Sequence, residues 1–322
     1  MKLTFLGTSA GMPTIERNVT ALALAIDDSK NWYLIDCGEG SQHQLLRCRY
    51  TLCNLRAIFI THVHGDHMFG LPGLLTSASM QGRTDSLTIY APKGVEEFVT
   101  TALRCADAHN LPFSLQFVRS DDPEFIFEDQ NFTVTAHALS HRVPCFAYRF
   151  SEQTYCTKLN TDRLKELKVP RGELWGLLQK GDTIILEDGQ KISPEQVMQS
   201  PPVSRTAVIA GDNDQPELLL GALKDADLLV HEATVTQEIL DKAGSVWMHS
   251  SAKMVAEAAQ KAQVPNVILT HFSGRYSLSK QVKETCVEVL KTEARQFYHG
   301  QIELAQDLKS WELSRSKILI RS

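Results

Sequence analysis

The sequence predicts a mixed α/β fold, because strand-like and helical patterns follow one another along the chain. Apolar or alternating segments at residues 2–5, 20–26 and 32–35 precede any long helix, which favours antiparallel hairpins at the start of the fold. A helical pattern follows at residues 68–80, and alternating strand patterns return between residues 115 and 150. Helices thus separate two regions that are rich in strands.

Three later strands each end in polar residues that can bind a metal or support a ligand. These apolar segments are residues 208–210, 228–230 and 267–270. The residues that follow them include Asp212, His231 and His271. We expect this repeated arrangement to collect the polar groups at one edge of the sheets.

The composition of this 322-residue chain is ordinary for a globular protein, with 43% hydrophobic and 22% charged residues. No apolar stretch approaches the length of a membrane span and no signal-peptide core follows Lys2, so we expect no membrane partner. The seven cysteines are scattered and odd in number, which favours reduced thiols in a cytoplasmic protein. The net charge of −5 does not indicate a nucleic-acid-binding protein, although this sum leaves room for a local basic patch.

The most informative stretch is residues 59–67, which read Phe-Ile-Thr-His-Val-His-Gly-Asp-His. It offers three imidazoles and one carboxylate within six positions, directly after the apolar residues 57–60. This short apolar run predicts a buried strand that ends where the histidines begin. A lone histidine is more often a surface or core residue, but so dense a group is typical of a metal site.

The spacing within this stretch allows two metal ions. Alternate side chains of an extended segment point the same way, so His62 and His64 can share one metal. A tight turn at Gly65 then lets Asp66 and His67 face a second metal. Imidazole and carboxylate ligands together suit Zn²⁺, with Mn²⁺ or Co²⁺ as possible substitutes.

The histidine motif and its surroundings resemble the tRNase Z (ribonuclease Z, or RNase BN) branch of the metallo-β-lactamase superfamily. Five other stretches carry the resemblance in the family's order, to about residue 307: residues 5–13, 36–40, 70–73, 231–234 and 271–276. The resemblance is to the short, single-unit form. It implies one catalytic domain over residues 1–322, a four-layer αββα sandwich, with an inserted tRNA-binding arm at residues 151–202. It also implies a homodimer, because the family's arm serves the active site of the neighbouring subunit.

The resemblance implies two zinc ions per subunit and a set of seven ligands. His62, His64 and His141 would bind one zinc, Asp66, His67 and His271 would bind the other, and Asp212 would bridge the two ions. His141 is preferred to His137 because it precedes residues 146–149, as the family's ligand precedes the matching stretch. His231 is expected outside the ligand set, where it would orient a ligand through its ring nitrogen, with direct ligation as the alternative.

The same resemblance implies the chemistry. A hydroxide between the two metals would attack phosphorus, since metal binding lowers the pKa of water to about 7. Asp66 is the expected proton acceptor, and His249 would donate a proton to the departing oxygen. Glu232 is placed to orient His249.

Further residues are expected to contact the substrate near the site. Arg17 and Arg275 suit phosphate, because a planar guanidinium matches that group, with structural salt bridges as the alternative. Ser250 could donate a hydrogen bond to phosphate, while the pattern is equally that of a helix cap for residues 251–263. Ile15 stands where the family usually has lysine, which bears on the handling of ends that carry CCA.

The segment at residues 151–202 has a different character, with short amphipathic helices and a concentration of cations before Trp175. These cations are Lys158, Arg163, Lys165, Lys168 and Arg171. In the family this arm grips the body of the tRNA, and cations there supply phosphate contacts with little sequence readout. A helical hairpin with a solvated charged face is the alternative. Residues 170–173 depart from the family's usual Gly-Pro tip, and no function is predicted for residues 308–322.

The resemblance therefore implies a zinc-dependent endoribonuclease that removes the 3′ trailer from precursor tRNA. One alternative is a hydrolase of small phosphodiesters or thioesters on the same scaffold, which would not need the cationic arm. The other is a metal-containing protein that binds RNA ends without cutting them. The presence of Asp66, Asp212 and His249 speaks against the second alternative, because a binding protein does not need a general acid.

Overall fold

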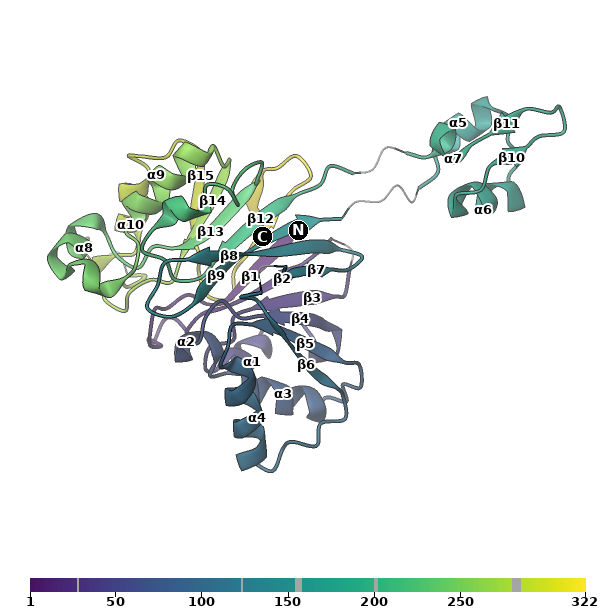
Figure 1. Cartoon of the computed structure of the whole chain (residues 1–322). Coiled ribbons are helices and arrows are strands. Elements are labelled where there is room, and N and C mark those ends of the chain that lie inside the picture. Colours follow the sequence, from purple (N-terminus) through teal and green to yellow (C-terminus); the bar gives the residue numbers. More distant parts are fainter. Residues whose placement is uncertain (28, 123, 154–157, 200–201, 280–284) are drawn as a thin grey trace. The chain divides into compact units, whose positions relative to one another are not determined.

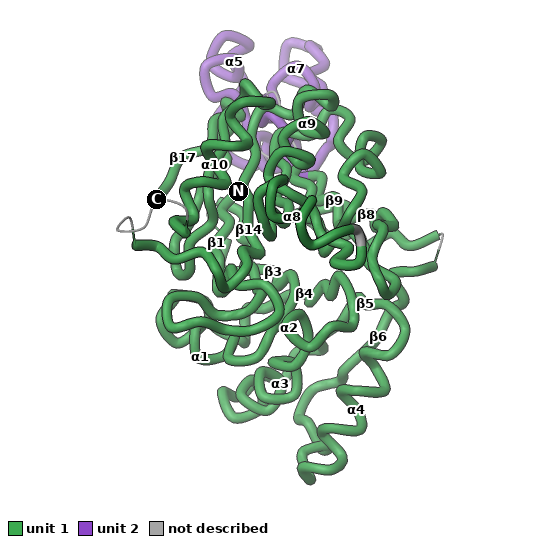
Figure 2. The backbone as a smooth tube through the Cα atoms, turned by 90° about the vertical axis from the view of Figure 1, so that its left-hand side faces the viewer, with its two compact units in different colours: residues 1–151, 205–322 green, residues 152–204 purple. Residues whose placement is uncertain are grey.

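The computed structural model describes residues 1–322 except 28, 123, 154–157, 200–201 and 280–284. The chain divides into two compact units (Figure 2): residues 1–151 with 205–322 form unit 1, and residues 152–204 form unit 2. The insertion expected from the sequence was residues 151–202. No helix in the described part of the chain is both long and apolar enough to cross a lipid bilayer.

Unit 1 contains two mixed β-sheets. Among the described residues, the first has the order β17-β16-β1-β2-β3-β4-β5-β6 and the second β15-β14-β13-β12-β9-β8-β7. The strands of the first sheet are β1 Lys2–Gly7, β2 Ala21–Ala25, β3 Trp32–Ile35, β4 Leu55–Phe59, β5 Leu87–Ala91, β6 Leu115–Arg119, β16 Ser310–Leu313 and β17 Leu319–Arg321. Those of the second are β7 Ile126–Glu128, β8 Phe132–Leu139, β9 Cys145–Glu152, β12 Thr206–Ala210, β13 Leu228–Glu232, β14 Asn266–Thr270 and β15 Gln301–Leu304.

The two sheets pack face to face around one core. Aromatic side chains from both sheets interlock there, with Phe59 on β4 edge-to-face against Phe150 on β9 at 5.1 Å between ring centroids. Tyr33 on β3 meets Phe132 on β8 in the same way at 5.2 Å. Burial of rings of this size contributes to the stability of the sandwich. The opening strands β1, β2 and β3 are antiparallel neighbours, as the sequence predicted.

Helices cover the two outer faces of the sandwich (Figure 1). On the first sheet, α3 (Leu71–Met80) and α4 (Val95–Cys105) bury their apolar faces in a second core that includes Leu74 and Val99. On the second sheet, α9 (Ala252–Ala262) and α10 (Glu288–Ala294) pack against the central core. The prediction of a four-layer αββα sandwich is confirmed.

Shorter helical segments join these layers: α1 (Ser41–Leu45), α2 (Gly65–Met68), α8 (Gln237–Ala243), and the 3-10 segments η1 (Leu52–Asn54), η2 (Pro216–Leu219) and η3 (Ser245–Trp247). The helix expected at residues 68–80 begins only at Leu71. The chain turns at Gly70, whose N–H donates to the Cys37 carbonyl at 2.8 Å. A Cβ at this position would lie 2.2 Å from the Gly38 carbonyl oxygen, so the close approach requires glycine.

The parallel strands of both sheets determine where the polar loops lie. In the first sheet β3, β4, β5 and β6 run parallel, and in the second sheet β12, β13, β14 and β15 do. Loops that follow parallel neighbours leave a sheet at the same edge. The residues after β4, β12 and β14 are therefore brought to one edge of the sandwich.

Residues 308–322, for which the sequence predicted no function, extend the first sheet. β16 pairs with β1 and β17 pairs with β16, both antiparallel. The indole of Trp311 is fully buried and lies edge-to-face on Phe5, with ring centroids 5.4 Å apart. This tail is consequently part of the central core.

Unit 2 has a small core of its own. Its elements are α5 (Thr161–Glu166), α6 (Glu173–Lys180), β10 (Ile184–Ile185), β11 (Lys191–Ile192) and α7 (Pro194–Val197). Leu164, Leu178 and Ile192 are fully buried in it. Asn160 caps α5 by accepting hydrogen bonds from the N–H groups of Asp162 and Arg163 at 3.2 and 3.0 Å.

Candidate metal centre

Loops from both sheets of unit 1 bring metal-ligating side chains together. The residues after β4 supply His62, His64, Asp66 and His67, with Gly65 opening α2. His141 follows β8, Asp212 follows β12 and His271 follows β14. Three overlapping groups result, in each of which the ligand atoms lie within 4.8 Å of one another: a first of His62, His64, His141 and Asp212, a second of Asp66, His67 and His271, and a third of Asp212, His249 and His271.

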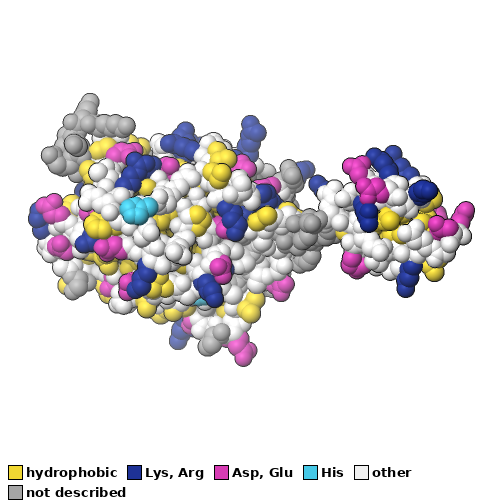
Figure 3. All heavy atoms as spheres, turned by 90° about the horizontal axis from the view of Figure 1, so that it is seen from above, with side chains coloured by type: hydrophobic (Ala, Val, Ile, Leu, Met, Phe, Trp, Pro, Cys, Tyr) yellow, Lys and Arg dark blue, Asp and Glu magenta, His cyan; other side chains and the backbone are white. Residues whose placement is uncertain are grey.

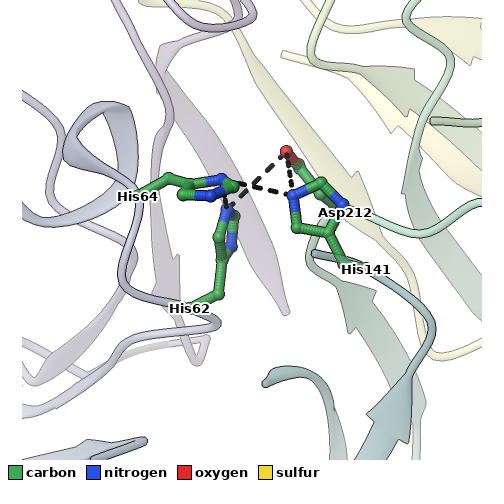
Figure 4. A group of neighbouring side chains, drawn as sticks. All are labelled: His62, His64, His141 and Asp212. Atoms are coloured by element: carbon green, nitrogen blue, oxygen red, sulfur yellow. Dashed lines mark hydrogen bonds and ion pairs between the residues drawn. The ribbon is translucent and has the colours of Figure 1, made fainter. Parts of the chain in front are cut away.

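The first group converges on a single point (Figure 4). His64 Nδ1 lies 3.1 Å from His62 Nε2 and 3.2 Å from His141 Nε2. The Asp212 Oδ2 atom lies 3.7 Å from His62 Nε2 and 3.8 Å from His141 Nε2. One proton cannot serve three nitrogens that face one another, whereas a cation can accept a lone pair from each.

The second group has the same character. Its closest pair of nitrogens, His67 Nε2 and His271 Nε2, is 3.3 Å apart. Asp66 Oδ2 lies 3.5 and 3.4 Å from these nitrogens. The other oxygen of Asp212, Oδ1, lies 3.5 Å from His67 Nε2 and 3.4 Å from His271 Nε2. Asp212 therefore turns one oxygen toward each group, which is the arrangement that a bridging ligand needs.

The electrostatics of the site fit bound cations. Burial, followed by the neighbouring histidines, holds the pKa of His62 well below its usual value, so this imidazole is neutral and keeps its lone pair. Burial acts in the same direction on His67, but the charges of Asp36, Asp212 and Asp66 outweigh it and raise the pKa of His67. The buried carboxylates of Asp36 and Asp212, together with the partly buried Asp66, favour positive charge in the site.

Three of the histidine ligands are held in place from outside the ligand set. His67 Nδ1 lies 2.7 Å from Asp36 Oδ2, and Asp36 Oδ1 accepts from the Thr61 N–H, also at 2.7 Å. His141 Nδ1 lies 3.0 Å from the Met248 carbonyl oxygen, and His271 Nδ1 lies 3.1 Å from Thr234 Oγ1. Such contacts fix which ring nitrogen faces the metal.

Asp36 is the functional residue that the sequence analysis missed. It lay within one of the stretches that carried the family resemblance, but no role was predicted for it. The available signal was its position directly after β3, since Asp212 and His271 also follow strand ends. Asp36 and His271 both have positive φ, 58° and 56°, a conformation that costs non-glycine residues about 1–3 kcal/mol.

His249 and Glu232 form a hydrogen-bonded pair beside the ligands. His249 Nδ1 lies 3.0 and 3.1 Å from the two carboxylate oxygens of Glu232. Glu232 is itself held by the N–H of Asn213 at 2.8 Å and the hydroxyl of Thr234 at 2.5 Å. Burial acts to lower the pKa of His249, but the charge of Glu232 and its hydrogen bond overcome this and raise the pKa to about 9. Protonated His249 can donate a proton.

A cavity of about 370 Å³ opens beside His64 and His141 of the first group and His249. It is lined by Ala10, Gly11, His64, His141, Arg142, Thr234, Trp247, His249 and Ser273. The N–H of Gly11, one of the lining residues, donates to Asp66 Oδ2 at 2.8 Å and so connects the lining to the second group. A phosphodiester could reach both the ligands and His249 through this cavity.

Two other histidines of the sequence analysis lie outside the ligand groups. His231 is buried, with its ring nitrogens 3.2 Å from Asn213 Nδ2 and 2.8 Å from the Glu232 carbonyl oxygen. It thus supports the loops that carry Asp212 and Glu232. His137 Nε2 lies 3.0 Å from Thr135 Oγ1, on β8.

The three expected substrate contacts near the site differ in exposure. The Arg17 guanidinium is 3% exposed and donates to the carbonyl oxygens of Ser273 and Tyr276, which is a structural role. The Ser250 hydroxyl donates to the Asn213 carbonyl, and the neighbouring Ser251 caps α9. Arg275 is exposed near the cavity.

The five cations predicted in the arm all lie on unit 2 and are exposed. Two of them are already paired, Arg163 with Glu166 at 2.7 Å and Lys165 with Asp162 at 2.9 Å. Figure 3 shows this mixture of basic and acidic side chains on the unit's surface. Arg171 lies over the ring of Trp175, 5.3 Å from its centroid. Exposed pairs of this kind contribute little to stability, so their charges remain available to a polyanion.

We predict that replacing Asp36 with Asn weakens metal binding by about 10- to 100-fold, because His67 loses the carboxylate that orients its ring. The metal affinity can be measured by competition with a chromogenic chelator. Asp107→Asn is the matched control, since its side chain is 98% exposed. Equal affinities of the two variants would show that the contact between Asp36 and His67 does not position the ligand.

Comparisons with known proteins agree with this geometry. The chain is 47% identical to ribonuclease Z from Marinobacter nauticus, an alignment that covers 98% of this chain and 97% of the relative. It is 42% identical to ribonuclease BN from Proteus mirabilis, over 89% and 94% of the two chains. A family model described as anti-Pycsar protein Apyc1 matches residues 1–105.

Solved structures give the same result. The short form of human tRNase Z superposes with a TM-score of 0.65 at 27% identity, over 96% of this chain and 98% of that one. The fold alone is shared with a diphosphatase of the PhnP family, at a TM-score of 0.58 and 16% identity over 99% and 97% of the chains. On the evidence of its fold, its metal-ligand groups and its full-length relatives, the chain belongs to the ribonuclease Z family.

Proposed function

We propose that the protein is a zinc-dependent endoribonuclease that removes the 3′ trailer from precursor tRNA. The single observation that carries the proposal is the position of Asp212, whose two carboxylate oxygens face two separate histidine groups. Membership of the ribonuclease Z family supports RNA as the substrate.

The two groups would each hold one zinc ion, so that a subunit carries two. His62, His64 and His141 would hold the first, Asp66, His67 and His271 the second, and Asp212 both. Mn²⁺ and Co²⁺ suit the same nitrogen and oxygen ligands and are possible substitutes. When bound, the metals would lower the pKa of a water enough for it to lose a proton near neutral pH and act as the nucleophile. They would also neutralise the charge of the phosphate oxygens.

The protein's own side chains would move the protons. Asp66 faces the second group through Oδ2 and is our choice to accept the proton of the attacking water. His249 would donate its proton to the departing 3′-oxygen of the tRNA, which leaves as a hydroxyl. Glu232 would act as a positioning residue, because both of its oxygens hold His249 Nδ1 and leave Nε2 as the donor.

The exposed cations of unit 2 would bind tRNA phosphates away from the cut. Lys158, Arg163, Lys165, Lys168 and Arg171 supply five positive charges within one small unit. Phosphate contacts of this kind position a nucleic acid without reading its sequence. Near the site we also propose that Arg275 contacts phosphate, whereas the buried positions of Arg17 and Ser250 weaken the proposal for these two residues.

We further propose a homodimer in the cytoplasm. The dimer is supported by the family resemblance, in which the arm of one subunit serves the site of the other, and light scattering should give twice the mass of 36.0 kDa. A mass of one chain at the concentrations used for activity would contradict it. The cytoplasmic location is supported by the free thiols of the six cysteines in the described part of the chain, and cell fractionation would test it.

Cleavage of a 3′-extended precursor tRNA tests the proposed activity. We expect a single cut at the 3′ side of the tRNA, with a 3′-hydroxyl on the product, which sequencing of the RNA ends can identify. Chelation should abolish the cut and added Zn²⁺ should restore it. Cleavage confined to a small chromogenic phosphodiester, by folded and metal-loaded protein, would rule out the tRNA substrate.

A change of leaving group tests the role of His249. We expect His249→Ala to lower kcat on precursor tRNA by about 10²- to 10⁴-fold, because the 3′-oxygen leaves poorly without a proton. The loss should be much smaller on bis-p-nitrophenyl phosphate, whose nitrophenolate leaves without protonation. Glu238→Ala, at an exposed glutamate, is the control. Equal losses on both substrates would mean that His249 does not act as the general acid.

A further inference from the structure

Trp247 lies in the lining of the cavity over the metal centre, together with His64, His141 and His249. Its side chain is partly buried against the central core and partly exposed. In the described part of the chain no other aromatic ring packs on it, and its indole N–H has no hydrogen-bond acceptor. Part of an indole without an aromatic partner therefore borders the space in which the substrate's cleaved bond would lie.

The residues before and after Trp247 both contact side chains near the metal centre through their backbone carbonyls. The Val246 carbonyl accepts a hydrogen bond from Arg142 Nη2 at 2.5 Å. The Met248 carbonyl lies 3.0 Å from Nδ1 of the ligand His141. Met248 has a positive φ of 51°, which turns the chain between Trp247 and His249. These contacts fix the indole relative to the reacting groups.

The guanidinium of Arg275 lies close to the indole of Trp247. It lies over the ring, 5.7 Å from the ring centroid. No carboxylate in the described part of the chain lies within 4.0 Å of this exposed guanidinium. Its charge is therefore free to meet a phosphate while the planar group still stacks on the ring.

We propose that Trp247 is the stacking platform for the nucleobase of one nucleotide next to the scissile phosphate, with Arg275 holding a phosphate of the same segment. The inference rests on the proposed function and adds a nucleotide-positioning residue to it. An aromatic face beside a cation is the usual means of holding single-stranded nucleic acid, and it tolerates any base because every base has a π face. The platform therefore aligns the strand without selecting a sequence.

Two variants separate stacking from packing. Trp247→Phe keeps a flat ring, whereas Trp247→Leu keeps apolar bulk but has no π face. We expect Trp247→Leu to lower kcat/KM on precursor tRNA by about 10-fold or more, mainly through KM, and Trp247→Phe to retain most of the activity. Val246→Ala is the control, because that neighbouring side chain is 74% exposed. Circular dichroism and metal content should match the wild type in all variants.

Precursors with a single abasic nucleotide, at each of two positions on either side of the cut, then identify the contact. At one position the missing base should slow the wild-type protein by the same factor as Trp247→Leu slows it on the intact RNA. On that substrate the wild type and Trp247→Leu should be equal. The inference is overturned if Trp247→Leu matches Trp247→Phe, or if its deficit persists on all four abasic substrates. Failure of the wild type to cut the intact precursor would instead overturn the proposed function.

Discussion

The carboxylate of Asp212 is the contact on which the rest of the site depends. It is 3% exposed and lies within 3.8 Å of nitrogens from His62, His67, His141 and His271. A buried carboxylate is energetically expensive unless a positive charge compensates it. The side chains around it would repel one another or remain unpaired without such a charge. The site is thus preorganised for cations, and its free energy of assembly depends on them.

The sandwich supplies the rigidity that this arrangement needs. His62 and His67 come from the first sheet, whereas His141, Asp212 and His271 come from the second. The relative position of the two sheets is fixed by interlocked aromatic rings such as Phe59 and Phe150. Because the ligands follow the ends of strands directly rather than lying in long loops, the packing of the core limits how far each side chain can be displaced. The core and the metal centre therefore constrain each other.

Much of this could be predicted from the sequence, because the ligands occur where apolar strands stop. The histidine motif after β4 and the polar residues after β12 and β14 were both visible as a change from apolar to polar residues. The αββα layers came from the family resemblance, since periodicity alone indicated only mixed α/β. Residues 308–322 were left without a function because a short strand at the sheet edge, such as β17, has too weak a pattern to identify.

Other features could not be predicted from the sequence and are visible only in the structure. The support of His67 by Asp36 joins residues that lie 31 positions apart. The left-handed backbone at Asp36 and His271 is uncommon for non-glycine residues, and the enrichment of Asp and His there is too weak to locate it in a sequence. The burial of Arg17 against backbone carbonyls could not be distinguished from phosphate binding in a sequence, because arginine serves both roles equally well. A role for Trp247 could be inferred only from its position in the cavity lining and its contact with Arg275.

Anomalous diffraction from crystals of the purified protein, collected at the zinc edge, tests the central claim most directly. The account predicts two peaks per chain, one within bonding distance of His62, His64 and His141 and the other within bonding distance of Asp66, His67 and His271. An oxygen of Asp212 should lie on each. A folded protein that is active without metal, or one with a single ion and Asp212 turned away from it, would contradict the account.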